Sequence, residues 1–388
     1  MTASLLPSVV DDYRALARTR LPRQLFEFID GGSFAEETVA SNRSDFARLR
    51  LRQRVLRPVG EIDLSTTVLG ERWALPVGLG PVGLAGLMRR RGELQALRAA
   101  QDAGTQFCLS TVALCPLEEV AAASQRPFWF QLYIMKDRGF ARELIARAKA
   151  AGCKALVLTV DLAVAGLRHR DVQTGMTGGL GWGGRARVAA DYARRWDWLW
   201  DVGVKGRPHL FGNLVSAVPN ARRLSDFYQF TSANWDPCVS WADIEWIRAE
   251  WGGPLVIKGI LDPEDAVQAV KAGAQALVVS NHGGRQLDGV GSTISCLPGI
   301  VQAVGGDAEV LLDGGVRNGI DVLRAVALGA RACLVGRPWI WALAARGQDG
   351  VAGLLATYKR ELQVSLALAG LTRIADVDRN ALASVGTP

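Results

Sequence analysis

The hydrophobic positions of this chain fall into short unbroken apolar runs that alternate with segments of helical spacing. The clearest example is residues 254–289, PLVIKGILDPEDAVQAVKAGAQALVVSNHGGRQLDG. Its two apolar runs, Leu255–Ile257 and Ala276–Val279, show no polar alternation, as is typical of strands buried on both faces. Between them, Asp262 is suited to cap a helix and Pro263 to its first position. The pattern predicts a strand–helix–strand unit with parallel strands.

The same alternation extends along most of the chain. The predicted strands are Pro76–Leu79, Thr105–Leu109, Pro127–Leu132, Ala155–Val160, Leu255–Ile257, Ala276–Val279, Glu309–Leu312 and Ala332–Val335. An internal repeat supports the count, because DAVQAVKAGAQALVVS from Asp265 matches DVLRAVALGARACLVG from Asp321. Eight strands that alternate with eight helices predict an α/β fold, the (β/α)8 or TIM barrel.

Two segments fall outside this alternation, within what we predict to be a single domain of residues 1–388. Residues 1–72 predict a helical preface, with helices near Val9–Arg18, Leu21–Ile29 and Phe34–Leu49. Residues 164–237 form a long insertion after the fourth strand, which mixes tryptophan with arginine in ARRWDWLWDVGVKGRP. Such insertions are often lids or attachment surfaces. The Trp and Arg residues predict contact with a membrane surface; the alternative is that the tryptophans fold back on the barrel rim.

The composition restricts the class of protein further. With 388 residues, 49% of them hydrophobic and 21% charged, the chain can bury a large core. It has no apolar run of 18 residues, and its N-terminus lacks the features of a signal peptide. We therefore expect a cytoplasmic protein or one that lies peripherally on the inner face of the cell membrane. The six cysteines show no CxxC spacing, so neither a disulfide nor a metal site is expected.

The net charge of +7 is compatible with nucleic acid, an anionic membrane surface or an anionic small molecule as the partner. No basic run with interleaved aromatic residues resembles a nucleic-acid module, so a nucleic-acid partner is not expected.

Polar residues and glycines gather where the predicted strands end, and in a barrel these carboxyl ends meet at one mouth. The set comprises Gly80, Pro81, Ser110, Gln131, Tyr133, Thr159, Asp161, Lys258, Ser280, His282, Asp313, Gly336 and Arg337. It suits an extended polar ligand. The last two loops, DGGVRNG and VGRPW, add Gly315 and Arg317, and their N–H groups and guanidinium groups predict a phosphate site.

Lys258 and His282 are ionisable side chains at the same mouth of the barrel, which indicates a functional role rather than a purely structural one. A buried Lys258 is unfavourable unless an anionic group faces it, and the N1/C2 carbonyl edge of a flavin, negative when reduced, would serve. Ser110, Gln131 and Thr159 are placed to hydrogen-bond its ring. There are three alternatives. The strand-end groups could only satisfy local backbone groups. Lys258 could form a Schiff base in a flavin-free phosphate-binding lyase, or the protein could be a barrel that has lost its catalytic activity.

The segment SNHGGRQLDG, residues 280–289, resembles the signature of the FMN-dependent 2-hydroxy-acid oxidases and dehydrogenases. Further matches cover nearly the whole chain in order: LPRQLFEFIDGGS, PVGLAG, LSTV, FQLY, TVD, VIKG, LDGGVRNG and ALGARACLVGRP. Within this family the chain is most similar to bacterial membrane-associated L-lactate dehydrogenases. The resemblance implies FMN, a small L-2-hydroxy-acid substrate, L-lactate first, and electron transfer to a membrane quinone or another carrier. It also implies a homo-oligomer, often a tetramer. The alternatives are oxygen as the acceptor and a mandelate-type or glycolate-type substrate.

The resemblance also implies roles for individual residues. His282 would accept a proton from the 2-hydroxy acid, and Asp161 would stabilise the imidazolium that results. Arg285 and Arg168 would hold the substrate carboxylate, for which a planar guanidinium is well shaped. Tyr133 would hydrogen-bond the substrate.

One position departs from the family pattern. The family usually has a tyrosine where this chain has Phe28, and its hydroxyl helps to hold the substrate carboxylate. Loss of one hydrogen bond to a charged group weakens binding by roughly 1.5 to 3 kcal/mol, about tenfold to a hundredfold. The resemblance therefore implies that Phe28→Tyr lowers the apparent KM for the true substrate.

Overall fold

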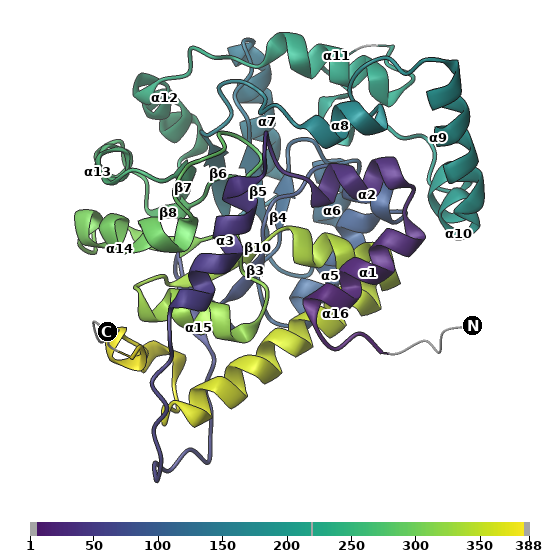
Figure 1. Ribbon diagram of the computed structural model, residues 1–388. Coiled ribbons are helices and arrows are strands. Elements are labelled where there is room, and N and C mark those ends of the chain that lie inside the picture. Colours follow the sequence, from purple (N-terminus) through teal and green to yellow (C-terminus); the bar gives the residue numbers. More distant parts are fainter. Residues whose placement is uncertain (1–5, 219, 384–388) are drawn as a thin grey trace.

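Eight parallel strands form the centre of the computed structural model, which describes residues 6–218 and 220–383 (Figure 1). They are β3 (Val77–Leu79), β4 (Cys108–Ser110), β5 (Trp129–Leu132), β6 (Ala155–Thr159), β7 (Leu255–Ile260), β8 (Ala276–Val279), β9 (Glu309–Leu312) and β10 (Ala332–Val335). Their order in the sheet is β3-β10-β9-β8-β7-β6-β5-β4. A parallel bridge from Leu79 to Phe107 joins β3 to the residue before β4 and closes the barrel. The predicted (β/α)8 barrel is confirmed.

The helices that alternate with these strands lie outside the barrel. They are α5 (Gly92–Asp102), α6 (Leu117–Ala123), α7 (Arg138–Ala150), α12 (Trp241–Trp251), α13 (Pro263–Lys271), α14 (Thr293–Val304), α15 (Gly319–Ala327) and α16 (Arg337–Leu368), with a short α4 (Ala85–Met88) before α5. Asp262 caps α13 as predicted, since its side chain accepts from the backbone N of Glu264 at 2.8 Å. α16 is two helices joined at Arg346 and Gly347, whose φ and ψ are not helical.

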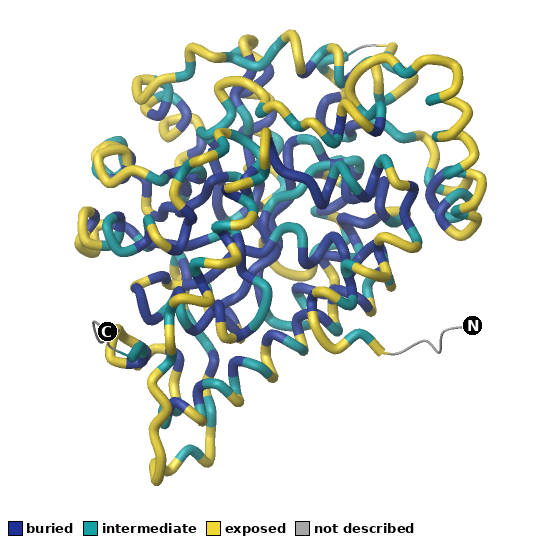
Figure 2. Tube along the Cα trace, in the orientation of Figure 1, coloured by how far each residue is buried: buried dark blue, intermediate teal, exposed yellow. Residues whose placement is uncertain are grey.

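The strands bury both of their faces, which explains their unbroken apolar runs. Alternate side chains, such as Val157, Val256 and Val278, fill the barrel interior in one cluster. The other residues of the same strands, such as Leu156 and Ile257, pack into a separate, larger cluster with the helices. Figure 2 shows this buried centre in dark blue.

The preface is not helical throughout. α1 (Val10–Arg20), α2 (Arg23–Asp30) and α3 (Glu37–Arg48) lie close to the predicted positions. The next regular structure is a hairpin that the sequence did not predict, β1 (Thr66–Val68) and β2 (Glu71–Trp73), whose turn residues Leu69 and Gly70 both have positive φ. Trp73 lies 5.5 Å from Trp129, the first residue of β5, so the hairpin closes the amino-terminal end of the barrel.

The insertion folds into helices rather than an irregular loop. It contains α8 (His169–Thr174), α9 (Trp182–Arg194), α10 (Trp196–Trp198) and α11 (Leu224–Asn234), which occupy the upper right of the view (Figure 1). Trp198 is buried and its Nε1 donates to the carbonyl of Leu87 at 2.7 Å, so this tryptophan folds back on the barrel. α9 has no buried residue (Figure 2). One tryptophan of the insertion thus folds back on the barrel, whereas Trp182 at the start of α9 is exposed, and contact with a membrane stays a prediction.

Candidate active site

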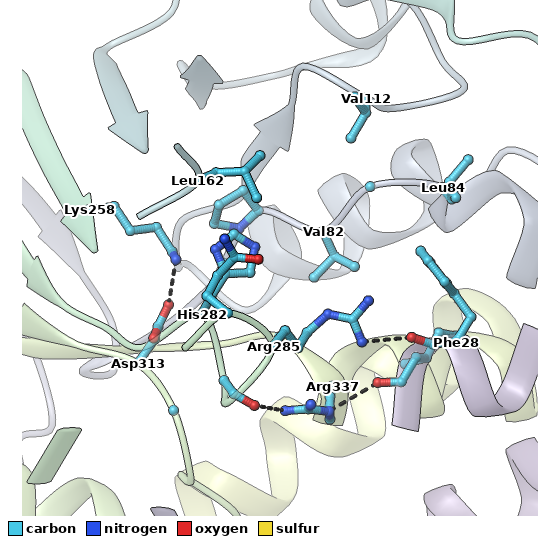
Figure 3. A pocket seen from close by; sticks show the side chains of 18 of the residues that line it. Phe28, Val82, Leu84, Val112, Leu162, Lys258, His282, Arg285, Asp313 and Arg337 are labelled. Carbon is cyan, nitrogen blue, oxygen red and sulfur yellow. Dashed lines mark hydrogen bonds and ion pairs between the residues drawn. The ribbon is translucent and has the colours of Figure 1, made fainter. Parts of the chain in front are cut away.

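A cavity of about 310 Å³ lies at the carboxyl ends of the barrel strands (Figure 3). Most of the residues predicted from the strand ends and from the resemblance line it: Phe28, Gly80, Pro81, Tyr133, Arg168, Lys258, His282, Arg285, Asp313, Gly315, Arg317, Gly336 and Arg337. Gly80 and Arg337, which follow the first and the last strand of the barrel, thus meet at one mouth because parallel strands of a closed barrel all end there.

Other predicted residues lie just behind the cavity wall: Ser110, Gln131, Thr159, Asp161 and Ser280. The hydroxyl of Ser110 donates to Oε1 of Gln131 at 3.0 Å. Thr159 lines a neighbouring cavity of about 340 Å³, which shares Tyr133 as part of its wall. The structure therefore brings the predicted set together as two layers, one that faces the cavity and one that supports it.

His282 is presented by a left-handed turn after β8. Its φ is +56°, and those of Gly283 and Gly284 are +66° and +73°. A side chain at positive φ is unfavourable, and such strain is common at functional sites. Nδ1 of His282 lies 2.8 Å from Oδ1 of Asp161, which follows the end of β6. Since a carboxylate only accepts, Nδ1 carries the hydrogen and Nε2 is left as a proton acceptor.

Asp161 is held in its ionised form. Burial by itself would raise its pKa, but the charges of His282 and Lys258 and the hydrogen bond from His282 keep the pKa of Asp161 below its usual value. Its second oxygen, Oδ2, is buried without a hydrogen-bond partner among the described residues. An ionised carboxylate behind the imidazole stabilises the protonated ring, so the pair is arranged to accept a proton from a bound molecule.

Lys258 is a fixed positive charge at the cavity floor. Its side chain belongs to β7 and the residue is only 4% exposed. Nζ lies 3.2 Å from Oδ2 of Asp313 (Figure 3) and donates to the hydroxyl of Ser280 at 2.9 Å. Burial alone would lower the pKa, yet the carboxylates of Asp313 and Asp161 raise the pKa of Lys258 above its usual value. A Schiff-base nucleophile must be a neutral amine, so this environment argues against the lyase alternative.

Two arginines that line the cavity lie over one aromatic ring, that of Phe28. Nη1 of Arg285 donates to the carbonyl of Phe28 at 2.6 Å (Figure 3), and Nε of Arg168 lies 2.8 Å from Oδ2 of Asp171. The guanidinium carbons of Arg285 and Arg168 lie 5.1 Å and 5.4 Å from the centre of the Phe28 ring. Burial and the neighbouring arginines hold the pKa of Arg285 well below its usual value. Because a guanidinium stays protonated in proteins, this crowding of positive charge favours a bound carboxylate.

Arg337 ties three segments together at the start of α16. Its Nε and Nη1 donate to the carbonyls of Ile29 and Gly283 at 3.0 and 2.6 Å (Figure 3), and its Nη2 donates to the carbonyl of Gly31 at 2.7 Å. Burial and the charge of Arg317 lower its pKa to about 10. Arg337 therefore joins α2 to the turn that carries His282, and its predicted role as an anion partner remains a prediction.

The loop after β9 approaches the preface closely. Gly315 has a φ of +88°, and a Cβ there would overlap the backbone carbonyl of Asn42 on α3. The side chain of Asn42 in turn donates to Asn281 Oδ1 at 2.8 Å, beside His282. Only glycine fits this position without movement of α3.

Gly315→Ala is therefore expected to lower the free energy of unfolding by about 2 to 4 kcal/mol, because it combines backbone strain with a clash. Chemical denaturation measures this change. Gly289→Ala is the matched control, since Gly289 has a similar φ of +75° and no heavy atom within 4 Å of the point that a Cβ would occupy. An equal loss in both variants would show that the approach to Asn42 has no energetic effect.

The sequence did not reveal the wall that α11 contributes. Tyr228, Thr231, Ser232 and Trp235 line the cavity from this helix, and their spacing of i, i+3, i+4 and i+7 places them on one face. This spacing could have shown that the four residues share one face of a helix, but nothing in the sequence of the insertion places that helix over the mouth of the barrel. Asp171, the partner of Arg168, was also missed, since nothing in the sequence pairs the two.

Several buried polar atoms lack a hydrogen-bond partner within the described part of the chain, among them Gln131 Nε2, Thr159 Oγ1, Asp313 Oδ1 and Arg317 Nε. They combine with the Lys258 ammonium and the glycine-rich loop after β9. Donors and acceptors in and behind the cavity wall, together with cationic groups and backbone N–H groups, suit a polar ring system that carries a phosphate, as a flavin mononucleotide does. The residues present therefore fit this cofactor. Among the described residues, no three His, Cys, Asp or Glu side chains form a group that could hold a metal ion.

Comparison with known proteins agrees with this chemistry. Residues 17–384 match the family described as FMN-dependent dehydrogenase. An L-lactate dehydrogenase of Caulobacter vibrioides is 53% identical over 98% of both chains. An L-lactate dehydrogenase of Yersinia pestis is 50% identical, over 98% of this chain and 99% of its own. The expected family resemblance is confirmed.

Solved structures give the same result for the fold. A monotopic membrane protein, (S)-mandelate dehydrogenase, superposes with a TM-score of 0.92 at 34% identity, over 98% of this chain and 100% of its own. A mandelate oxidase superposes with a TM-score of 0.82 at 38% identity, over 97% and 98%.

Proposed function

Because this chain belongs to the FMN-dependent dehydrogenase family, we propose that it oxidises an L-2-hydroxy acid, L-lactate first, to the corresponding 2-oxo acid. The observation that carries the proposal is that one cavity contains both a proton acceptor and a pair of arginines suited to a carboxylate. We call this pair, Arg168 and Arg285, the carboxylate clamp. The His282–Asp161 pair and the Arg168–Arg285 pair suit, respectively, the hydroxyl and the carboxylate of such a substrate.

FMN is the cofactor, as the sequence predicted. When bound, it supplies the acceptor for the two electrons that leave the substrate. The residues that we expect to hold it are Gly80, Pro81, Ser110, Gln131, Thr159, Lys258, Ser280, Asp313, Gly315, Arg317, Gly336 and Arg337. Lys258 provides positive charge to the ring, and the loop after β9 with the start of α16 provides N–H groups and arginines to the phosphate.

The side chains of the chain divide the work on the substrate. Arg168 and Arg285 bind and orient the carboxylate, and Tyr133, which lines the same cavity, hydrogen-bonds the substrate. Burial raises the pKa of Tyr133 to about 12, so its hydroxyl stays a donor at neutral pH. Nε2 of His282 accepts one proton from the 2-hydroxy acid, and ionised Asp161 stabilises the imidazolium.

L-Lactate is favoured over mandelate by the relatives. The named L-lactate dehydrogenases are 50% and 53% identical to this chain, whereas the mandelate enzymes are 34% and 38% identical. An anaerobic stopped-flow panel of L-lactate, glycolate and (S)-mandelate tests the proposal. We expect the yellow flavin absorbance to bleach fastest with L-lactate. No bleaching with any 2-hydroxy acid would contradict the function, and faster bleaching with mandelate would reassign the substrate.

We also propose that the electrons pass to a membrane quinone and that the insertion lies on the membrane surface. Trp182, Trp196 and Trp200 are 88%, 67% and 50% exposed, and α9 carries arginines beside them. Indole and guanidinium groups together suit an interface with anionic lipid. The structural likeness to a monotopic membrane protein supports this placement. No helix within residues 6–218 and 220–383 is long and apolar enough to cross a bilayer.

Replacing Trp182, Trp196 and Trp200 together by serine is expected to lower sedimentation with vesicles that contain anionic phospholipid by at least tenfold, because the exposed apolar area is lost. Leu56→Ser is the matched control, since Leu56 is fully exposed on the loop between α3 and β1, which extends from the other end of the molecule (Figure 1). Equal sedimentation of the triple variant and the wild type would contradict membrane contact through the insertion. Reoxidation of the reduced enzyme by oxygen rather than by a soluble quinone would contradict the proposed acceptor.

The homo-oligomer, a tetramer, is proposed on the family resemblance alone. Light scattering of the purified protein measures its mass against the 41.7 kDa of one chain.

A further inference from the structure

Tyr228 is a polar side chain of the cavity wall that no predicted role uses. It lies on α11 of the insertion, on the face that also carries Thr231 and Trp235. Its ring packs edge-on against Phe211, with the ring centres 5.9 Å apart. The aromatic ring therefore has a packing partner, and the hydroxyl requires a separate explanation.

The hydroxyl of Tyr228 is buried and has no hydrogen-bond partner among the residues that the structure describes. Burial raises the pKa of the phenol, while the nearby charges of Arg168 and Arg285 act in the opposite direction. The hydroxyl is thus a neutral donor that lies within electrostatic reach of both arginines of the carboxylate clamp. Buried hydroxyls without partners are rare in proteins, and each one needs an explanation, of which a functional role is one.

The carboxylate clamp has no neutral hydrogen-bond donor at the position of Phe28. The ring of Phe28 lies under both guanidinium groups at 5.1 Å and 5.4 Å and offers no hydroxyl. A carboxylate has about four acceptor positions, and two guanidinium groups that also serve Asp171 and two backbone carbonyls leave some of these positions open.

We propose that Tyr228 donates its hydroxyl to the substrate carboxylate between Arg168 and Arg285, and so supplies from the insertion the hydrogen bond that Phe28 cannot make. This inference rests on the proposed function, because it names a further substrate-binding residue of the same site. The insertion then has a second role: α11 completes the carboxylate site as well as covering it.

A purely structural role explains the observations less well. A phenylalanine at position 228 would keep the contact with Phe211 and would leave no polar atom unpaired. The hydroxyl has a function only when an acceptor enters the cavity beside the arginines.

Tyr228→Phe in the FMN-loaded enzyme tests the proposal. We expect the dissociation constant for oxalate, a carboxylate probe that cannot be oxidised in this reaction, to rise about tenfold to a hundredfold. The KM for L-lactate should rise similarly and kcat should change less. Flavin absorbance changes on titration measure oxalate binding without turnover.

Tyr192→Phe is the matched control. Tyr192 lies in the same insertion but does not line the cavity, and its hydroxyl donates to Gln24 at 2.9 Å. It should leave oxalate binding unchanged. Phe28→Tyr should restore oxalate binding in the Tyr228→Phe background, and in the wild-type enzyme its effect should be smaller, because Tyr228 already donates there.

The outcomes separate this inference from the proposed function. Unchanged oxalate binding in Tyr228→Phe, an equal loss in Tyr192→Phe, or no rescue by Phe28→Tyr would overturn the role of Tyr228 even if L-lactate is oxidised. Failure of the wild type to oxidise any 2-hydroxy acid would overturn the proposed function, while a selective loss of oxalate binding in Tyr228→Phe would still support the carboxylate contact.

Discussion

Replacing His282 by glutamine is expected to lower kcat with L-lactate about a thousandfold, while the purified protein keeps its FMN and its yellow colour. Among the described residues that line the cavity, the imidazole is the group whose free nitrogen is set up as a proton acceptor, because Nδ1 is engaged by Asp161 at 2.8 Å. Glutamine fills a similar volume but cannot accept a proton at neutral pH. Steady-state kcat and the rate of anaerobic flavin bleaching measure the effect, and the flavin-to-protein absorbance ratio measures retention of FMN.

His209→Gln provides the control for this variant. Nε2 of His209 lies 2.9 Å from the carbonyl of Val202 within the insertion, and the residue does not line the cavity. It should retain kcat. A His282→Gln enzyme with kcat within tenfold of wild type would contradict the assignment of His282 as the proton acceptor.

The barrel was predictable because its strands are buried on both faces, so the apolar runs stand out against the helical segments. The ends of these runs also located most of the cavity, since barrel closure brings every strand end to one mouth. The short β1–β2 hairpin was missed because each strand has only three residues, and its signal is a single Leu69-Gly70 turn. Such a hairpin depends on the barrel interior, where Val68 and Trp73 are buried.

The contribution of the insertion could not be predicted in the same way. The periodicity of hydrophobic residues does not show where the 74-residue insertion, residues 164–237, packs against the barrel. Its position depends on single tertiary contacts, such as the hydrogen bond in which the buried side chain of Asn213 accepts from the backbone N of Leu117 at 2.8 Å. Tyr228 reaches the cavity, and Asp171 reaches Arg168, only because of such contacts. The resemblance located the arginine pair, but the structure was needed to show the Phe28 ring that lies beside both guanidinium groups.

Replacing Lys258 by methionine is expected to lower the free energy of unfolding by about 3 to 5 kcal/mol and to release FMN during purification. Methionine matches the aliphatic part of lysine, so packing changes little. The variant leaves the carboxylates of Asp313 and Asp161 without the ammonium whose positive charge now stabilises both. Chemical denaturation of the FMN-free proteins measures stability independently of cofactor affinity, and absorbance after gel filtration of the FMN-loaded proteins measures flavin content.

The control for this variant removes the carboxylate as well. In Lys258→Met/Asp313→Asn no unpaired charge remains at the 3.2 Å contact, so much of the lost stability should return while FMN binding stays weak. This divergence would separate two roles: Lys258 neutralises buried carboxylates in the protein, and it presents positive charge to the flavin ring. If the double variant regained both stability and flavin, Asp313 rather than Lys258 would control cofactor binding.

A separate experiment tests the lyase alternative. Borohydride treatment of the wild type with a carbonyl compound should leave Lys258 unmodified, because the raised pKa of Lys258 keeps its amine protonated. Covalent labelling of Lys258 would instead support the lyase alternative.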